Sequence, residues 1–434
     1  MRRNIYNSIY YCVLGLILIV ISSMAIIQRE DFLMRVFDVL AWILIINGLH
    51  ELSVFLRRRF RGDLINIIGN IGVGIFILSY TAIPIRLLFA IFAIYITLNG
   101  IIKFISYLNY KKDKVIKRFP VLCGALFLII YGLALLLGRY ADANAMMIFI
   151  GGYGLLLGIN YIIDGIFTAI PQQHKDSLKR RIRIPVPIFI SALVPKVMMD
   201  YINERLAVEP TEKFLDDQNH ANVEIFIHVS PDGFGTIGHC DICIDNQVIS
   251  YGNYDYDSIR LFETIGDGVL FIAPRESYIP FCIETDHKTI FSYGVRLTVK
   301  QLASVKREIE KLKENTYPWY PRSYKDRNDC NDYASRLYLR TGASFFKFKR
   351  GRYKTYFVLG SNCVKLAEAI MGKAGMDIID LNGIISPGTY QNYLEKEYQR
   401  ANGVIISKNV YNQLTIDHKW DIIMEYYGYV KERQ

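Results

Sequence analysis

Residues 238–255 read GHCDICIDNQVISYGNYD. Two short runs in this stretch are rich in β-branched and aromatic residues, and Asp245-Asn246-Gln247 lies between them. Such runs predict two antiparallel strands, and the polar segment between them predicts a tight hairpin turn. The hairpin indicates that this half of the chain belongs to a water-soluble α+β domain.

The sequence on either side of the hairpin continues the pattern. VEIFIHVS at 223–230 and GVLFIAP at 268–274 predict further antiparallel strands. Thr298 and Gln301 form a capping-box pair, and the apolar residues after them recur at helical spacing. We therefore expect a helix over about 299–314 packed against the strands.

Cys363 and His239 are the candidate catalytic pair. The strand-like TYFVLG at 355–360 leads to Asn362, a residue type that caps helices, and Cys363 follows it at a predicted helix start. Unpaired N–H groups and the dipole at a helix start favour a thiolate. His239 begins a strand after a Gly-rich turn, from which its ring can reach a cleft. The two residues suffice for nucleophilic catalysis, in which imidazole removes the thiol proton and the thiolate attacks an acyl carbon.

The hairpin string, SNCVKLAEAIMG at 361–372 and IISPGTYQNYL at 384–394 together resemble the permuted papain-like superfamily, which includes NlpC-like and lecithin:retinol acyltransferase-like proteins. The resemblance covers about 222–395. It implies a thiol hydrolase or acyltransferase that acts through an acyl-enzyme on lipids or on amide bonds, with Cys363 as nucleophile and His239 as base. Family members place a third polar group, often His, about a dozen residues after the base. This chain has no His there, and Tyr251 fits the spacing best.

Other Cys and His residues allow alternative interpretations. Cys330 is a rival nucleophile, because it too follows a capping Asp and begins a predicted helix. His228 on the preceding strand either reaches the same cleft or belongs to the core. Cys240 and Cys243 should point to opposite faces of one strand, which disfavours a zinc site. We expect neither a metal nor another cofactor, since no nucleotide-binding or EF-hand motif occurs.

Residues 1–170 have a different character. The whole chain of 434 residues is 52% hydrophobic, and its six long apolar runs all lie in this part. Each run approaches the roughly 20 residues that cross a hydrocarbon core of about 30 Å. The predicted spans are 6–27, 32–56, 63–82, 84–107, 119–138 and 145–169.

The net charge of +10 lies at the flanks of these spans. Residues 1–185 hold 21 Lys and Arg against 9 Asp and Glu, so the remainder is close to neutral. A nucleic-acid partner is therefore not expected, since it would need cations on the soluble domain. With six spans, 16 flanking cations fall on the side of both termini and four on the other: Arg29, Arg35, Arg86 and Arg139. The positive-inside rule then predicts a bacterial inner-membrane protein with cytoplasmic N- and C-termini.

A repeat runs through the apolar half. Asn47-Gly48 recurs 52 residues later as Asn99-Gly100, and more loosely as Gly158 after a further 58. Glycines at matching positions let helices approach closely, which suggests three helical hairpins in tandem. The pattern over roughly 1–170 resembles the HdeD-like acid-resistance membrane family. Ionisable side chains are few and lie near the ends of the spans, so an anchor or scaffold is favoured over a transporter.

The sequence thus predicts four parts: a six-span domain at 1–170, a basic and amphipathic linker at 171–221, a papain-like domain at 222–400 and a C-terminal extension at 401–434. The linker helix either lies on the inner leaflet or packs on its own domain. We expect a membrane-anchored cysteine hydrolase or acyltransferase with membrane lipids as partners and a lipid or lipidated substrate. An amide-bond hydrolase acting on peptides or cell wall, and an inactive papain-like sensor or binding module, remain alternatives.

Overall fold

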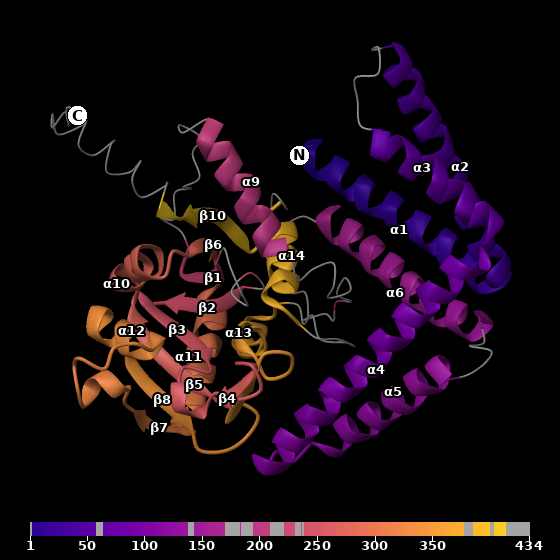
Figure 1. Cartoon of the computed structure of the whole chain (residues 1–434). Helices are drawn as coiled ribbons and strands as arrows, with labels where there is room; N and C mark the ends of the chain where they lie inside the picture. The colour runs from indigo at the N-terminus through magenta and orange to yellow at the C-terminus, as the bar shows by residue number, and fades with distance from the viewer. Residues whose placement is uncertain are drawn as a thin grey trace, which may run out of the picture. The chain divides into compact units, whose positions relative to one another are not determined.

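The computed structural model describes residues 2–57, 64–137, 143–169, 183, 194–208, 221–230, 236, 238–376, 385–399 and 403–413. The chain divides into two compact units (Figure 1). The first contains Met1–Phe104 and Leu122–Ala169, and the second contains Ile105–Val121 and Ile170–Gln434. The second unit is therefore assembled from two separate stretches of sequence.

The first unit is helical. Its helices are α1 (Arg2–Gln28), α2 (Glu30–Arg57), α3 (Leu64–Ser79), α4 (Ala82–Lys112), which continues into the second unit, α5 (Phe119–Leu137) and α6 (Ala143–Ala169). All six predicted helices are present. Five helices in the described part are long and apolar enough to cross a membrane, whereas α3 is apolar but has only 16 residues.

Glycines lie where these helices come closest. A Cβ atom on Gly158 of α6 would lie 2.9 Å from the carbonyl oxygen of Gly15 on α1. The repeated glycines Gly48 and Gly100 also lie at close helix contacts. A Cβ atom on Gly48 would come within 2.6 Å of Ile71, and one on Gly100 within 2.7 Å of Ile129. These contacts join α1 with α6, α2 with α3 and α4 with α5. The close pairs therefore connect helices from different predicted hairpins, rather than the two helices of each tandem hairpin.

Replacing Gly158 by Leu should lower the thermal midpoint of helix unfolding in detergent, measured by far-ultraviolet circular dichroism. The added side chain would overlap the α1 backbone, and overpacking of this kind costs about 1–3 kcal/mol. Gly152→Leu is the matched control on the same helix, because no atom lies within 4 Å of its Cβ position. Equal midpoints for the two variants would contradict the α1–α6 packing.

The second unit is built on an eight-stranded antiparallel sheet in the order β10-β6-β1-β2-β3-β5-β8-β7. The strands are β1 (Val223–Val229), β2 (His239–Ile244), β3 (Gln247–Gly252), β5 (Val269–Pro274), β6 (Thr289–Val295), β7 (Thr316–Trp319), β8 (Ser344–Phe348) and β10 (Ile405–Tyr411). A small second sheet pairs β4 (Ile265–Asp267) with β9 (Thr355–Phe357). The C-terminal antiparallel domain expected from the strand pattern is present.

Helices cover both faces of the large sheet. One core lies between the sheet and α9 (Val194–Val208), α11 (Val299–Glu314), α13 (Cys363–Met371) and α14 (Pro387–Tyr398). The other core contains α10 (Arg275–Pro280) and α12 (Tyr333–Thr341). Side chains along each strand alternate between these two cores, as β geometry requires. Ile242 of β2, for example, belongs to the first core and Cys243 to the second.

Local sequence signals account for several of these elements. Asp245 and Asn246 both have positive φ, at 49° and 61°, which matches the tight hairpin predicted between β2 and β3. Thr298 accepts a hydrogen bond from the Gln301 N–H, and the Gln301 side chain accepts one from the Thr298 N–H, so the capping box is confirmed. Helix α11 follows it directly.

The second unit extends beyond the predicted 222–400. Residues 405–411, expected in a C-terminal extension, form β10 and pair with β6. In the linker, Met199 and Ile202 of α9 are 5% and 3% exposed within the first core. Of the two interpretations of the linker helix, packing on its own domain is therefore the one observed.

A segment between α4 and α5 also belongs to the second unit. Asp113 is buried, and its carbonyl oxygen accepts a hydrogen bond of 2.9 Å from the Gly351 N–H. A Cβ on Gly360 would lie 2.7 Å from the Ser106 hydroxyl. Ser106 near the end of α4 and Asp113 just after it therefore lie against the loops on either side of β9.

Candidate active site

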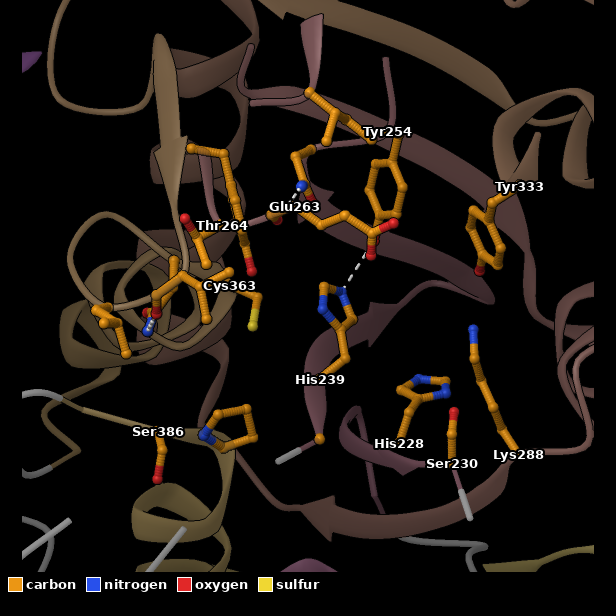
Figure 2. A pocket seen from close by; sticks show the side chains of 18 of the residues that line it. His228, Ser230, His239, Tyr254, Glu263, Thr264, Lys288, Tyr333, Cys363 and Ser386 are labelled. Atoms are coloured by element: carbon orange, nitrogen blue, oxygen red, sulfur yellow. Dashed lines mark hydrogen bonds between the residues drawn. The ribbon is translucent and has the colours of Figure 1, made fainter. Parts of the chain in front are cut away.

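A cavity of about 390 Å³ lies where β2 begins and α13 begins (Figure 2). Its wall combines the two predicted catalytic residues with aromatic and polar side chains. The lining includes His228, Ser230, His239, Tyr254, Tyr256, Glu263, Thr264, Tyr278, Lys288, Asp332, Tyr333, Tyr356, Asn362, Cys363 and Ser386. Both Cys363 and His239 are therefore brought to one concave site.

Cys363 is the first residue of α13. Asn362 caps the helix, since its side-chain oxygen accepts a hydrogen bond of 3.1 Å from the Lys365 N–H and its carbonyl accepts one from Leu366. The Asn362 amide also donates to the carbonyl oxygens of Val358 and Ile385, at 2.8 and 2.7 Å. This cap holds the start of the helix against two loops, so the position of the Cys363 sulfur is set by backbone contacts.

The His239 ring lies between Cys363 and a group of oxygen atoms. Its Nε2 atom is 3.0 Å from Asp241 Oδ1 and 2.9 Å from the hydroxyls of both Ser250 and Tyr254. The opposite side of the ring faces the Cys363 sulfur (Figure 2). His239 thus has one nitrogen toward the thiol and one toward an acid, the arrangement that a general base needs.

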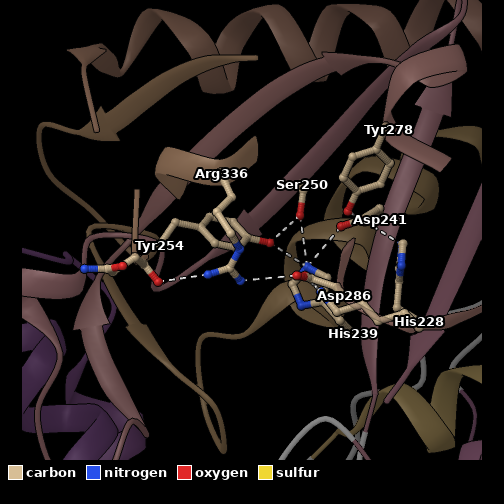
Figure 3. A network of polar contacts seen from close by, with 10 residues as sticks. His228, His239, Asp241, Ser250, Tyr254, Tyr278, Asp286 and Arg336 are labelled. Atoms are coloured by element: carbon tan, nitrogen blue, oxygen red, sulfur yellow. Dashed lines mark hydrogen bonds and ion pairs between the residues drawn. The ribbon is translucent and has the colours of Figure 1, made fainter. Parts of the chain in front are cut away.

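Asp241 supplies that acid. It lies two residues after His239 on β2, so strand alternation places both side chains on the same face. The Asp241 carboxylate is buried, and its Oδ2 atom accepts a hydrogen bond of 2.7 Å from the Tyr278 hydroxyl and lies 2.7 Å from His228 Nε2 (Figure 3). Cys363, His239 and Asp241 therefore form a Cys–His–Asp arrangement.

The charges of the three groups support one another. Burial would raise the pKa of Cys363. The charge of His239, a hydrogen bond from His239 and a hydrogen bond from the Cys240 N–H together hold that pKa below its ordinary value of 9.0. Burial would lower the pKa of His239, but the Cys363 and Asp241 charges raise it to about 10. Burial would also raise the pKa of Asp241, whereas His239 and His228 keep it well below its usual range. Each shift in pKa favours the charged form of its group: the thiolate of Cys363, the imidazolium of His239 and the carboxylate of Asp241.

Tyr251, the residue expected in the third position, lies elsewhere. Its ring is buried in the first core against Tyr353 and Tyr356, and its hydroxyl donates a hydrogen bond of 3.0 Å to the Tyr353 carbonyl. The neighbouring Ser250 faces His239 instead, because successive residues of β3 point to opposite faces. The sequence interpretation missed Asp241, although an Asp in an otherwise apolar strand, two residues from the base, was a visible signal.

The alternative cysteines occupy different environments. Cys330 is partly buried and does not line the cavity. Cys240 and Cys243 belong to the two opposite cores, as the strand alternation predicted. No cluster of three or more His, Cys, Asp or Glu side chains suited to a metal ion occurs among the residues that the structure describes.

Comparison with known proteins informs the first unit only. Residues 65–137 match the family described as a short repeat of unknown function, DUF308, which includes HdeD-like membrane proteins. The match agrees with the predicted repeat and with a multi-pass membrane protein. No curated protein and no solved structure shows significant similarity to the chain.

Replacing His239 by Ala should raise the pH at which Cys363 becomes reactive. In the wild type, the lowered thiol pKa gives a thiolate below pH 9, and the His239 charge that stabilises it is lost only as pH rises through about 10. Without His239 only the Cys240 N–H still opposes the effect of burial, so the thiol pKa should rise, and alkylation at neutral pH should fall roughly tenfold for each unit of that rise. Iodoacetamide labelling followed by peptide mass spectrometry measures this rate.

Cys330 provides an internal control for that measurement, since it lies outside the cavity in the same protein sample. Its labelling rate should not respond to the His239 substitution. An unchanged pH profile for Cys363 in His239→Ala would show that the imidazole does not activate the thiol.

Proposed function

We propose that the chain is a membrane-anchored cysteine hydrolase or acyltransferase that works through an acyl-enzyme. Cys363 is the nucleophile, His239 is the general base and acid, and Asp241 orients the His239 ring. The observation that carries the proposal is that Cys363 and His239 line a single cavity and His239 lies 3.0 Å from the buried Asp241, with the thiol pKa lowered and the imidazole pKa raised. An unreactive core cysteine would be expected to have a raised pKa instead.

In the first step the Cys363 thiolate attacks the acyl carbonyl carbon, and a C–S bond forms. Because Asn362 engages the N–H groups of Lys365 and Leu366, those of Cys363 and Val364 are the donors at this helix end suited to the oxyanion. The His239 imidazolium then gives its proton to the departing oxygen or nitrogen. The products are a thioester on Cys363 and a free alcohol or amine.

In the second step an acceptor molecule replaces the departed group. His239, now neutral, takes a proton from water or from an acceptor alcohol or amine, whose oxygen or nitrogen attacks the thioester carbonyl. The C–S bond breaks and the Cys363 thiolate is restored beside a protonated His239. Water as acceptor makes the enzyme a hydrolase, and another nucleophile makes it an acyltransferase.

One resemblance supports this assignment, and the distribution of charge supports its location. The order of a His strand before an Asn-Cys helix resembles the permuted papain-like superfamily, and the antiparallel sheet with α13 packed against β2 is compatible with that fold. For the first unit we propose six spans, with α3 as the short one, in a bacterial inner membrane. The asymmetry of flanking cations favours cytoplasmic termini and hence a cytoplasmic active site.

A lipid or lipidated substrate is favoured by the mouth of the cavity. Tyr256 and Glu263 line the cavity, and the loop between them exposes Leu261 by 61% and Phe262 by 89%. Tyr256 is itself 61% exposed, and Arg322 lies over its ring at 5.1 Å. Exposed apolar and aromatic side chains beside a cation are typical of surfaces that contact the lipid interface. We call residues 256–263 the rim loop.

Cys363→Ala should abolish hydrolysis of ester and thioester probes by the purified full-length protein in detergent, by at least about 10³-fold, because the acyl-enzyme cannot form. Cys330→Ala is the matched control and should retain activity. Undiminished hydrolysis by Cys363→Ala would refute the assignment. Cleavage of amide probes alone would favour the amide-hydrolase alternative, and no Cys363-dependent cleavage of any probe would favour the binding module.

Replacing Leu261 and Phe262 together by Ser should reduce cleavage of an acyl probe carried in lipid vesicles by roughly tenfold, since burying two such side chains in the interface contributes about 1.5 kcal/mol or more. Cleavage of a water-soluble ester should change much less. Val299→Ser removes an equally exposed apolar side chain, 87% accessible, at the start of α11 and is the control. Equal losses for both probes would argue against a lipid-contacting rim loop.

A further inference from the structure

His228 is buried beside the catalytic acid, on a different strand from it. It lies directly opposite His239 in the β1–β2 register, and only 3% of His228 is exposed. Its Nε2 atom is 2.7 Å from Asp241 Oδ2, while His239 Nε2 is 3.0 Å from Asp241 Oδ1. One carboxylate is therefore shared by two imidazole rings, whose centroids are 6.2 Å apart.

We propose that His228 is a positioning residue for the acyl-transfer reaction: it holds the Asp241 carboxylate in the orientation that fixes the His239 ring toward Cys363. This inference rests on the proposed function and assigns a role to a residue that lines the cavity and acts through Asp241 rather than on the thiol itself. Tyr278 assists from α10, because its hydroxyl donates to the same Oδ2 atom at 2.7 Å.

The geometry explains why a hydrogen-bond donor is needed at this position. A carboxylate has two oxygens, and a buried one is costly when either lacks a donor. His239 Nε2 lies 3.0 Å from Oδ1, while the Tyr278 hydroxyl donates a hydrogen bond to Oδ2 and His228 Nε2 lies 2.7 Å from the same Oδ2 atom. With both oxygens engaged, the carboxylate cannot rotate about its terminal bond without losing contacts, and the His239 ring is held with it.

The charge state of His228 suits this role. Burial lowers its pKa below the ordinary value of 6.5, so it is neutral at neutral pH and can donate one N–H to Asp241. The titratable groups that face it are Asp241 and His239 on β2, Tyr278 on α10 and Lys288 just before β6. A second imidazolium beside His239 would compete for the carboxylate charge, whereas a neutral donor supports the His239 cation.

A histidine that only fills the core would affect stability and leave the chemistry of Cys363 unchanged. The two roles are separated by the pH profile of Cys363 alkylation, measured with iodoacetamide on the full-length protein in detergent alongside its thermal midpoint. His228→Leu keeps the volume and removes the donor. His228→Gln keeps an N–H donor at a similar distance from the backbone and is the conservative control.

We expect His228→Leu to move the Cys363 profile to higher pH, with alkylation at neutral pH reduced roughly tenfold, which corresponds to one pKa unit. His228→Gln should restore most of the rate, and Asp241→Asn should give a shift at least as large as His228→Leu. A folded His228→Leu protein with the wild-type profile would overturn the proposal. If His228→Leu does not fold, Tyr278→Phe decides, since it removes another donor from Oδ2: a shift in the same direction is expected, and an unchanged profile overturns the proposal.

The wild-type profile separates this inference from the proposed function. A wild-type Cys363 with the reactivity of an ordinary thiol would contradict the proposed enzyme, whatever the His228 variants do. An activated wild-type Cys363 that is insensitive to His228 and Tyr278 would leave the enzyme assignment intact and refute the positioning role alone.

Discussion

The buried carboxylate of Asp241 is the constraint on which the rest of the site depends. A charge in an apolar interior is tolerated only when it is paired and hydrogen-bonded. Its contacts come from β1, from the start of β2 and from α10, through His228, His239 and Tyr278. Any change in how these elements pack would leave a charge without partners, so packing of the sheet and geometry of the thiol site are maintained together.

Sequence periodicity predicted most strands and helices of this unit, and local context singled out Cys363 and His239, which the structure places in one cavity. The third member was predictable only in part. Spacing from the base favoured Tyr251, but strand alternation turns that side chain into the opposite core and turns Ser250 toward His239. Asp241 was overlooked because it stands between Cys240 and Ile242, in a run whose composition is that of a core strand.

The membrane half shows a second limit of prediction from sequence, which concerns the pairing of helices. Hydropathy located all six helices, because the length of an apolar run follows directly from the sequence. Glycine positions predicted close helix contacts, yet a glycine does not specify which neighbour approaches it. The pairing of α1 with α6 depends on long-range packing that no local pattern contains. The strand β10 escaped prediction for a similar reason, since its pairing with β6 crosses more than a hundred residues.

The contact between Asp113 and Gly351 has a consequence for how the protein is made. The ribosome completes residues 105–121 long before it reaches β9, so one piece of the thiol-containing unit must wait for the remainder of that unit to be synthesised. A fragment that begins at residue 222 would lack this piece together with α9, and would leave the Gly351 N–H and part of the first core without their partners. The helical unit and the thiol-containing unit are thus not two segments joined end to end, because each is assembled from two separate stretches of the chain.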